Sequence, residues 1–391
     1  MNKSIKVNKR VFLWTLCMCI LIRPAGLVHV LGIESISRMA CLVLSGFTIL
    51  IAIQSHSIPM TNMVYIVMNL WLVLCTLFRT SSADLYECFI VAYTNIGIVC
   101  FICYAMRKDM FQCLKAVYAS YTVLIIANFF YMFVKPEGYN LSEWILYGRG
   151  YYMFGHQNTT ITYVLPAICV ALIGYRKNLI KRWQMLTTIL FSLGSIIKVF
   201  SVTSLVGLGV FFGVLFLLER GKVKKYLKAG WAIWIGTGAC IGIVFFNIQT
   251  KGLIADFIVN VLHRTTNFTS RTTIWENALR LISNNWLLGI GYRINTTFQS
   301  LIHGSSAHNE YLFMILQGGV VLLALFYAFF IFSKRVLESN SETYVSRVFT
   351  ALYFSLFVQF LTETHMHRLA VLLALVGCAG IMITDERKGK Y

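Results

Sequence analysis

The chain has 391 residues, of which 58% are hydrophobic and only 13% are charged, and its mean hydropathy is +0.71. Soluble domains carry about 25% charged residues, so this composition excludes a protein that exposes its whole surface to water. The formal net charge of +19 would suggest nucleic acid for a soluble chain. No Lys/Arg-rich tail with interleaved aromatic residues is present, and we expect no nucleic-acid partner.

Apolar stretches of about the length that crosses a bilayer recur throughout the chain. Twelve are predicted, and they cover residues 11–32, 37–54, 58–78, 85–106, 111–134, 159–175, 184–200, 205–218, 229–248, 311–332, 345–361 and 369–384. The alternating pattern of a membrane barrel is absent from the sequence. We therefore predict an all-α, polytopic integral membrane protein in which residues 1–391 form a single transmembrane domain of about twelve helices.

The connectors between these stretches fall into two alternating sets. One set is dense in lysine and arginine, and it covers residues 1–10, 107–110, 176–183, 219–228, 333–336 and 385–391. Cytoplasmic connectors carry such an excess, so we predict that this set and both termini lie in the cytoplasm. The first apolar stretch, which is broken at Arg23 and Pro24, is typical of a retained signal anchor.

The other set of connectors is predicted to lie outside, and it contains two long loops, 135–158 and 249–310. Its basic residues are mostly arginines, namely Arg79, Arg149, Arg264, Arg271, Arg280, Arg293 and Arg368. Basic residues are disfavoured on this side of a membrane, and a guanidinium group can bind two phosphate oxygens at once. The set therefore suggests a phosphate-bearing substrate, and pairing with lipid headgroups is the alternative for any one arginine.

Within the longer loop, residues 270–285 have a helical period. Apolar side chains gather on one face, made by Ile274, Trp275, Ala278, Leu279, Leu281 and Ile282. This pattern predicts an amphipathic helix that lies on the membrane or folds over a cavity. Arg271 falls in the first turn, where a cation opposes the helix dipole, so we expect an anionic ligand to bridge Arg271 and the first N–H groups.

Two short motifs follow that helix. Residues 289–293 (GIGYR) contain two glycines, which permit a tight turn and a close backbone approach. His308, Asn309 and Glu310 stand at the mouth of the next apolar stretch. A histidine can accept a proton near neutral pH, and the alternative is that the polar residues only cap the helix. His303, His308 and Glu310 lack the HExxH spacing of a zinc site, and we predict no metal and no cofactor.

Other polar residues lie at the same side of the predicted membrane domain. His156 and Asn158 precede the sixth apolar stretch, and Lys198 ends the seventh, where a cation near the membrane is a functional candidate. The aromatic residues of 151–160 are typical of an interfacial belt, and sugar stacking is the alternative. A charged group in 362–368 consists of Glu363, His365, His367 and Arg368, and it can pair within itself.

The order of these motifs resembles the O-antigen ligase and polysaccharide polymerase superfamily of bacterial envelope enzymes. The similarity lies in SRTTIWENALRLISNNWLLGIGY followed by HNEYLFMILQGGVVLLALFYAF, and it covers about the last third of the chain. Its residues are Arg271, Trp275, Gly289, Gly291, His308, Asn309, Gly318 and Gly319. One departure is Ser204-Leu205, where many members have Ser-Arg, and Lys198 or another arginine could compensate.

The resemblance implies glycosyl transfer on the outer face of a bacterial cytoplasmic membrane. The donor would be an oligosaccharide linked to polyprenyl diphosphate, with membrane lipid around it and room for a chain-length regulator as a protein partner. By analogy, Arg271 would engage the diphosphate and His308 would activate the acceptor hydroxyl. The residues predicted to bind substrate are Arg79, Arg149, His156, Asn158, Lys198, Arg280, Arg293 and Asn309.

Three functions fit this sequence. A polymerase would join repeat units into capsule, exopolysaccharide or O-antigen, and a ligase would transfer a finished glycan to another acceptor. A flippase or transporter for lipid-linked glycans is a third class that also suits twelve spans. It would be expected to carry charges in its central spans and paired broken helices, whereas this chain concentrates its polar residues in the exterior connectors, which favours an enzyme.

Overall fold

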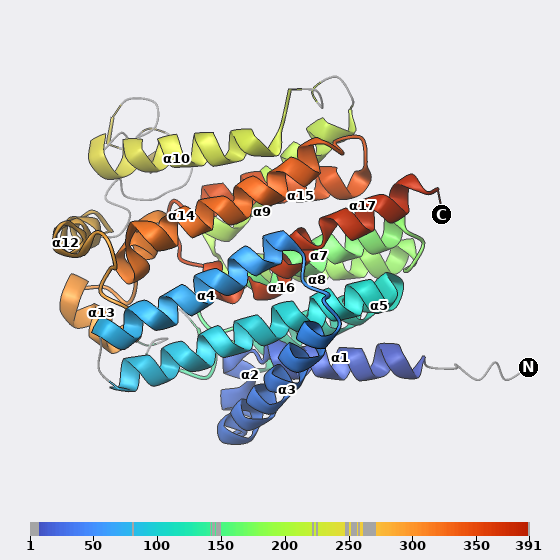
Figure 1. The fold of residues 1–391 in the computed structure, drawn as a ribbon, viewed down its shortest axis with the longest axis horizontal. Coiled ribbons are helices and arrows are strands. Elements are labelled where there is room, and N and C mark those ends of the chain that lie inside the picture. The colour runs from blue at the N-terminus through green and yellow to red at the C-terminus, as the bar shows by residue number, and fades with distance from the viewer. Residues whose placement is uncertain are drawn as a thin grey trace, which may run out of the picture.

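The computed structural model describes residues 8–79, 82–140, 142, 145, 150–220, 223, 226–246, 250–251, 256, 259–260 and 271–389. Over these residues the fold is all-helical, as predicted, with two isolated backbone bridges and no strand. The elements are α1 Lys9–Ile22, α2 Ala25–Val30, α3 Glu34–Gln54, α4 Met60–Arg79, α5 Ser82–Val134, η1 Gln157–Thr159, α7 Ile161–Arg176, α8 Arg182–Val199, α9 Val202–Glu219, α10 Ala229–Phe246, α12 Arg271–Asn285, α13 Asn295–Ile302, α14 Glu310–Glu338, α15 Tyr344–Gln359, η4 Met366–Arg368, α16 Ala370–Gly377 and α17 Ala379–Arg387. Figure 1 shows the longer helices running roughly side by side.

Seven of the described helices are long and apolar enough to cross a membrane. They are α3, α4, α5, the stretch Gln157–Arg176, α9, α10 and α14. The other apolar stretches fall on α1, α8, α15, α16 and α17, which do not meet the same length and hydropathy limits. A polytopic membrane protein is thus supported, and the count of twelve spans stays a prediction.

Helix α5 combines two of the predicted stretches. Its backbone leaves the helical region at Asp109, with φ −163° and ψ 93°. The Asp109 carboxylate accepts a hydrogen bond from the Gln112 N–H at 3.1 Å, which is the geometry of a helix N-cap. Asp109 also pairs with Arg10 at 3.6 Å. The 53 residues of α5 are therefore two helices joined at the basic connector 107–110.

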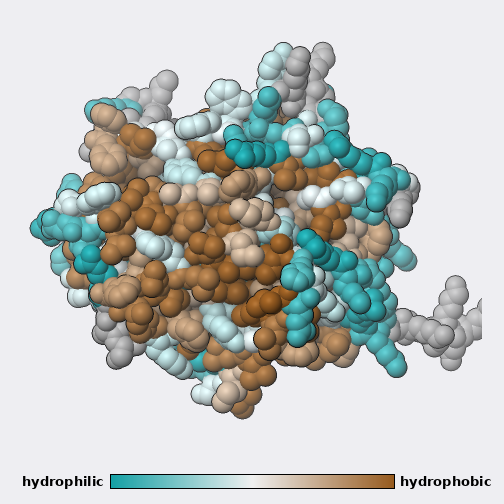
Figure 2. Space-filling model, viewed as in Figure 1, coloured by the Kyte–Doolittle hydropathy of each residue, from teal (hydrophilic) through white to brown (hydrophobic). Residues whose placement is uncertain are grey.

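The two predicted sets of connectors gather at opposite ends of the molecule. At one end, Lys177 pairs with Asp385 at 3.0 Å, and Arg347 pairs with Glu219 at 2.8 Å. Helix α1 begins and α17 ends there, whereas α12 and α13 lie at the other end (Figure 1). Figure 2 shows a broad hydrophobic surface between hydrophilic patches at these ends. Which end faces the cytoplasm stays a prediction.

Helix α14 is broken by its two glycines, and the Gly289–Gly291 turn fills the break. Gly319 has φ +66°, and a Cβ there would lie 1.9 Å from the Leu287 carbonyl oxygen. Because the helical bonds are interrupted, the Leu316 and Gln317 carbonyls accept the N–H groups of Ile290 (2.7 Å) and Gly291 (3.0 Å). The two glycine motifs thus contact each other, and this contact holds the loop after α12 against α14.

Candidate functional site

Glu363 lies four residues after the end of α15 and joins side chains from three other segments. Its Oε1 accepts hydrogen bonds from Arg271 Nη2 at 2.7 Å and from Asn158 Nδ2 at 2.7 Å. Its Oε2 lies 3.6 Å from His308 Nδ1. We call Asn158, Arg271, His308 and Glu363 the Glu363 cluster. Glu363 is only 5% exposed, so its charge depends on these partners.

Helix α12 brings Arg271 to the cluster. The predicted helix at 270–285 is confirmed as Arg271–Asn285, and Ile274, Trp275 and Ala278 are its buried residues. The indole Nε1 of Trp275 donates to the Ala307 carbonyl at 2.9 Å. Because Ala307 directly precedes His308, one buried tryptophan ties the helix that carries the arginine to the segment that carries the histidine.

Arg271 has a protein carboxylate as its anion. Besides the bond to Glu363, its Nη1 donates to the Thr362 carbonyl at 2.5 Å. The Glu363 carboxylate thus balances the cation in the first turn of α12, and the expected bridging of Arg271 and the first N–H groups by a ligand anion stays a prediction. The Arg271 side chain is still 16% exposed, which leaves part of the guanidinium accessible to a second anion.

His308 and Asn309 have different roles. His308 has a left-handed backbone, with φ +44°, and its side chain is 27% exposed. Asn309 is fully buried, accepts the Leu312 N–H at 3.0 Å and donates to the Leu361 carbonyl at 3.1 Å. Asn309 is thus the N-cap of α14, which is the alternative role that the sequence left open, and its role in substrate binding stays a prediction.

Glu310 fixes the distance between the His308 segment and the Glu363 segment. Its Oε2 accepts the N–H groups of His365 at 2.5 Å and Met366 at 3.1 Å, and its own N–H donates to the Phe360 carbonyl at 2.9 Å. Glu310 is fully buried. Since these bonds join residue 310 to both sides of Glu363, they set how closely the imidazole and the carboxylate approach.

Asn158 connects the cluster to the start of α9. While its amide nitrogen donates to Glu363, its Oδ1 accepts from Ser201 Oγ at 2.8 Å, and Ser201 Oγ lies 2.7 Å from Ser204 Oγ. His156 caps η1, because its Nδ1 accepts the Asn158 N–H at 3.4 Å. His156 is therefore close to the cluster and does not touch Glu363 in any recorded contact.

Burial shifts the pKa values of Glu363 and His365, two titratable residues of this connector, in opposite directions. Burial alone would raise the pKa of Glu363, but Arg271 and His308 outweigh it and hold that pKa well below the usual value. Burial lowers the pKa of His365 to about 4, although the Glu363 charge opposes the change. Glu363 is thus an anion and His365 is neutral at physiological pH.

In the described part of the chain, unpaired buried carboxylate and imidazole atoms, unlike unpaired polar atoms in general, are confined to residues of this connector and of the segment 308–310. Among the described residues, every buried carboxylate or imidazole atom without a hydrogen-bond partner belongs to His308, Glu310, His365 or His367. Both ring nitrogens of His365 are in this group, and that residue is 2% exposed. Since buried polar groups are nearly always paired, such a concentration is typical of a site that receives another molecule or water.

Several predicted substrate-binding residues lie apart from the cluster. Lys198 is exposed, with its ammonium 5.3 Å from the Phe133 ring centre. Arg280 is exposed and bonds to Asn277 on its own helix at 3.1 Å. The structure joins neither residue to Glu363, so the expectation that Lys198 compensates for the missing arginine beside Ser204 finds no support. Arg149 and Arg264 lie outside the described residues.

Arg293 and Arg79 belong to a neighbouring contact that anchors the glycine turn. Arg293 donates to the buried Asp84 carboxylate at 3.2 Å and to the Arg79 carbonyl at 2.7 Å. Asp84 also accepts the Ile294 N–H at 3.0 Å. Arg293 thus anchors the loop through a carboxylate, and its role in substrate binding stays a prediction. The Arg79 side chain is exposed and lies 3.5 Å from the Asn285 amide oxygen.

Sequence reasoning missed the central position of Glu363. The group 362–368 was expected to pair within itself, whereas Glu363 pairs with residues that precede it by 55, 92 and 205 positions. The available signal was an acid in a connector otherwise rich in histidine and arginine. Ser201 and Ser204 were also left without a role, although the hydroxyl groups reach the cluster through Asn158.

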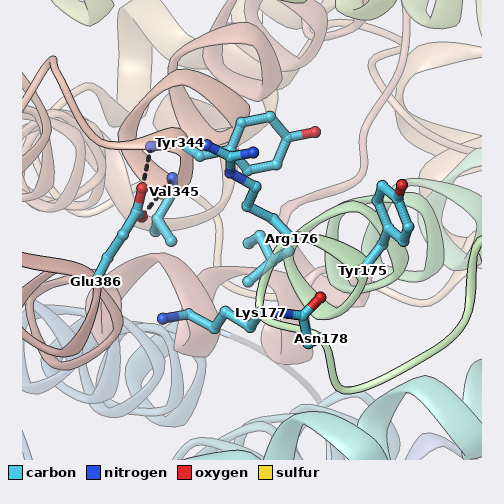
Figure 3. A pocket seen from close by; sticks show the side chains of 8 residues that line it. Tyr175, Arg176, Lys177, Asn178, Tyr344, Val345 and Glu386 are labelled. Carbon is cyan, nitrogen blue, oxygen red and sulfur yellow. Dashed lines mark hydrogen bonds between the residues drawn. The ribbon is translucent and has the colours of Figure 1, made fainter. Parts of the chain in front are cut away.

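One cavity lies at the opposite end of the molecule. It has a volume of about 480 Å³ and is lined by residues that include Arg176, Lys177, Tyr344 and Glu386. Figure 3 shows the Glu386 carboxylate bonded to the first N–H groups of α15, at 2.7 Å for Tyr344 and 3.2 Å for Val345. Glu386 thus caps α15 and Lys177 pairs with Asp385, which is a structural arrangement.

Metal binding and similarity to known proteins complete the description of the site. Within the described ranges, no three His, Cys, Asp or Glu side chains are grouped as metal ligands.

Residues 152–327 match the family model described as O-antigen ligase. This match includes Asn158, Arg271 and His308 and ends before Glu363. No curated protein matches the chain.

Proposed function

Because the chain is a helical membrane protein that belongs through residues 152–327 to the O-antigen ligase family of glycan-transferring envelope enzymes, we propose that it polymerises oligosaccharide repeat units carried on polyprenyl diphosphate. The product would be a capsule, exopolysaccharide or O-antigen chain. The reaction would occur on the outer face of the bacterial cytoplasmic membrane, with the loops 135–158 and 249–310 outside and both termini inside. The observation that carries the proposal is the Glu363 carboxylate, which bonds to Arg271 and faces His308.

In this proposal His308 is the general base. Its Nδ1 faces Glu363, which leaves Nε2 to take the proton from the acceptor hydroxyl. The acceptor oxygen then forms a bond to the anomeric carbon of the donor sugar. The bond from that carbon to the diphosphate oxygen breaks, and its electron pair leaves with the polyprenyl diphosphate. Glu363 would orient the imidazole and stabilise the imidazolium that forms.

Arg271 would bind the diphosphate with the part of its guanidinium that Glu363 and Thr362 leave accessible. A planar guanidinium can hold a carboxylate and a phosphate oxygen at the same time. The developing charge on the leaving group would then be neutralised where it forms. Arg79 and Arg280, exposed at the same end, would attract the anionic donor, and Asn158 would hold Glu363 in position.

A ligase is the second candidate, because the matched family model is described as O-antigen ligase. The two reactions share the donor and differ in the acceptor, which is a growing chain in one case and a different molecule in the other. A flippase has less support. The buried ionisable side chains among the described residues lie at helix ends and connectors, and they are Asp84, Lys177, Glu310, Glu363 and His365.

The test is a reconstituted reaction in proteoliposomes with a polyprenyl-diphosphate oligosaccharide. A ladder of products would support polymerisation, and a single transfer to an added acceptor would support ligation. We expect His308→Ala and Arg271→Ala to abolish both kinds of product at equal protein levels. Wild-type product lengths in both variants would refute the proposed roles, and transport without bond formation would favour the flippase.

A further inference from the structure

Four aromatic rings form a continuous row on the predicted outer end of the molecule. The His29 and Tyr139 rings have centres 4.8 Å apart, Tyr139 and Tyr151 are 5.9 Å apart, and Tyr151 and His156 are 5.5 Å apart. We propose that this aromatic row binds the sugars of the glycan that the Glu363 cluster extends or transfers, and this inference rests on the proposed function.

The row is held by the backbone, so its rings are ordered before a ligand arrives. The Tyr139 N–H donates to the Tyr151 carbonyl at 2.9 Å. Gly138 makes this contact possible, because it has φ +77° and a Cβ there would lie 2.4 Å from the Tyr151 carbonyl oxygen. His29 is fixed by a 2.8 Å contact with Glu34. Ordered aromatic side chains lose little conformational entropy on binding, which favours their use in recognition.

The row leads to the reacting groups. His156 caps the turn that contains Asn158, and the Asn158 amide donates to Glu363 at 2.7 Å. A glycan lying along the rings from His29 towards His156 would therefore present its end near His308. Sugar rings have faces of C–H bonds, and these pack on the electron-rich face of an aromatic ring. The centre-to-centre spacing is close to the size of one sugar ring, so successive sugars can meet successive side chains.

Exposure distinguishes the row from aromatic residues that anchor a membrane protein in the lipid interface. Trp286, at the same end, is 59% exposed, and Trp234, at the opposite end, is 69% exposed, as interfacial anchors are. In contrast, Tyr139, Tyr151 and His156 are half-buried and contact one another. The His29 side chain, at the end of the row, is more exposed, at 56%. A row of mutually packed rings beside polar groups suits a carbohydrate better than lipid chains.

The experiment measures binding without turnover. Purified protein in detergent is titrated with two probes, the water-soluble oligosaccharide released from the lipid-linked repeat unit by mild acid, and polyprenyl phosphate without sugar. We expect the double variant Tyr139→Ala/Tyr151→Ala to bind the oligosaccharide about tenfold or more weakly and to bind polyprenyl phosphate as before. The double Phe variant, which keeps both rings, should bind the oligosaccharide like the wild type.

Trp286→Ala is the matched control, because it removes an exposed aromatic side chain at the same end and should leave both affinities unchanged. Unaltered oligosaccharide affinity in the double Ala variant would overturn the proposal, and an equal loss for both probes would assign the row to lipid. His308→Ala separates the two proposals. Lost turnover with intact oligosaccharide binding supports both, whereas intact turnover rejects the role of His308 and leaves the aromatic row to be judged by binding alone.

Discussion

The two ends of α15 each have a glutamate that accepts two consecutive backbone N–H groups. Near its N-terminus Glu386 accepts those of Tyr344 and Val345, and beyond its C-terminus Glu310 accepts those of His365 and Met366. Glu386 is half-buried and completes a helix cap, with the Lys177–Asp385 pair beside it. Glu310 is fully buried, and its Oε1 has no recorded partner. The same arrangement of hydrogen bonds thus occurs twice. At Glu386 the neighbouring carboxylate has a partner, and at Glu310 one carboxylate oxygen and the neighbouring imidazole atoms lack them.

The difference indicates which end is prepared for a ligand. An ion pair or a helix cap that satisfies its own atoms can be explained by folding alone. The Glu363 cluster cannot, because imidazole and carboxylate atoms remain unpaired beside it although the cost of burying them is high. The cavity of about 480 Å³ lies at the opposite end, so a cavity does not by itself identify the end that binds a ligand.

The largest expected effect comes from removing the charge of Glu363. In Glu363→Gln the side chain keeps its shape, but Arg271 loses its anion and His308 loses the carboxylate that would stabilise its protonated form. We expect a loss of turnover of about 10²–10⁴-fold, the range of general-base contributions. The measurement is the initial rate of product formation in proteoliposomes at equal protein content.

Glu386→Gln is the control at the other end of α15. It makes the same chemical change and should leave turnover within about twofold, because the opposite end has no part in the reaction. Equal losses in both variants would mean that the effect arises from folding, and the comparison between the two ends would then fail.

A smaller effect is expected when Glu310 is shortened. Glu310→Ala removes the bonds that set the distance between His308 and Glu363, and misplacement by about 1 Å can cost about 10²-fold in rate. We expect kcat to fall by about 10–100-fold while KM for the donor changes little. Glu310→Gln, which keeps an acceptor oxygen for the two N–H groups, should restore most of the rate.

Glu386→Ala is the matched variant for this experiment, since it also deletes a carboxylate that accepts two consecutive N–H groups. We expect it to lower the melting temperature without a change in kcat. If Glu310→Ala lowered the melting temperature alone, Glu310 would have only a structural role, like Glu386.

The sequence predicted the parts of this site that are local and left out those that depend on packing. The helix at 271–285, the glycine turn and the cap at the mouth of α14 follow from periodicity and from residue type within a few positions. The partnership of Glu363 with Arg271 spans 92 positions and depends on how α12 and the connector after α15 fold over α14. The division of α5 into two helices at Asp109 was also predicted locally, because the charged connector 107–110 interrupts the apolar sequence.

Two of the predicted binding residues have structural partners that the sequence did not show, for a related reason. The composition identified arginines on the predicted outer side, but not which of them already had a carboxylate. Arg293 donates a hydrogen bond to Asp84, which precedes it by 209 positions. The Asn309 amide bonds to backbone groups of its own helix and of the segment after α15. Pairing between distant segments thus decides which polar residues remain available, and a linear pattern does not contain that information.

The smallest effect that we predict is a pH dependence of stability at the Glu363 end. The pKa of His365 is about 4 in the folded protein and 6.5 when unperturbed. The unfolded chain therefore binds more protons at this residue between these values, and the contribution of His365 to stability falls as pH is lowered from 6.5 towards 4. Burial raises the pKa of Glu310 to about 7, so Glu310 contributes in the opposite direction over the same range. Between pH 6.5 and 5 the loss from His365 is on the order of 2 kcal/mol, and the depressed pKa of Glu363 adds its own loss only below about 4.5.

His365→Asn removes this titration while keeping a polar side chain of similar size. Relative to the wild type, the melting temperature of the variant in detergent should therefore fall less, or rise more, as pH is lowered from 6.5 to 5. His367→Asn is the comparison, because burial lowers the pKa of His367 as well, and each variant should remove only its own share of the slope. An unchanged slope in His365→Asn would mean that His365 is solvated in the folded protein, and the unpaired nitrogens would then no longer distinguish this end from the other.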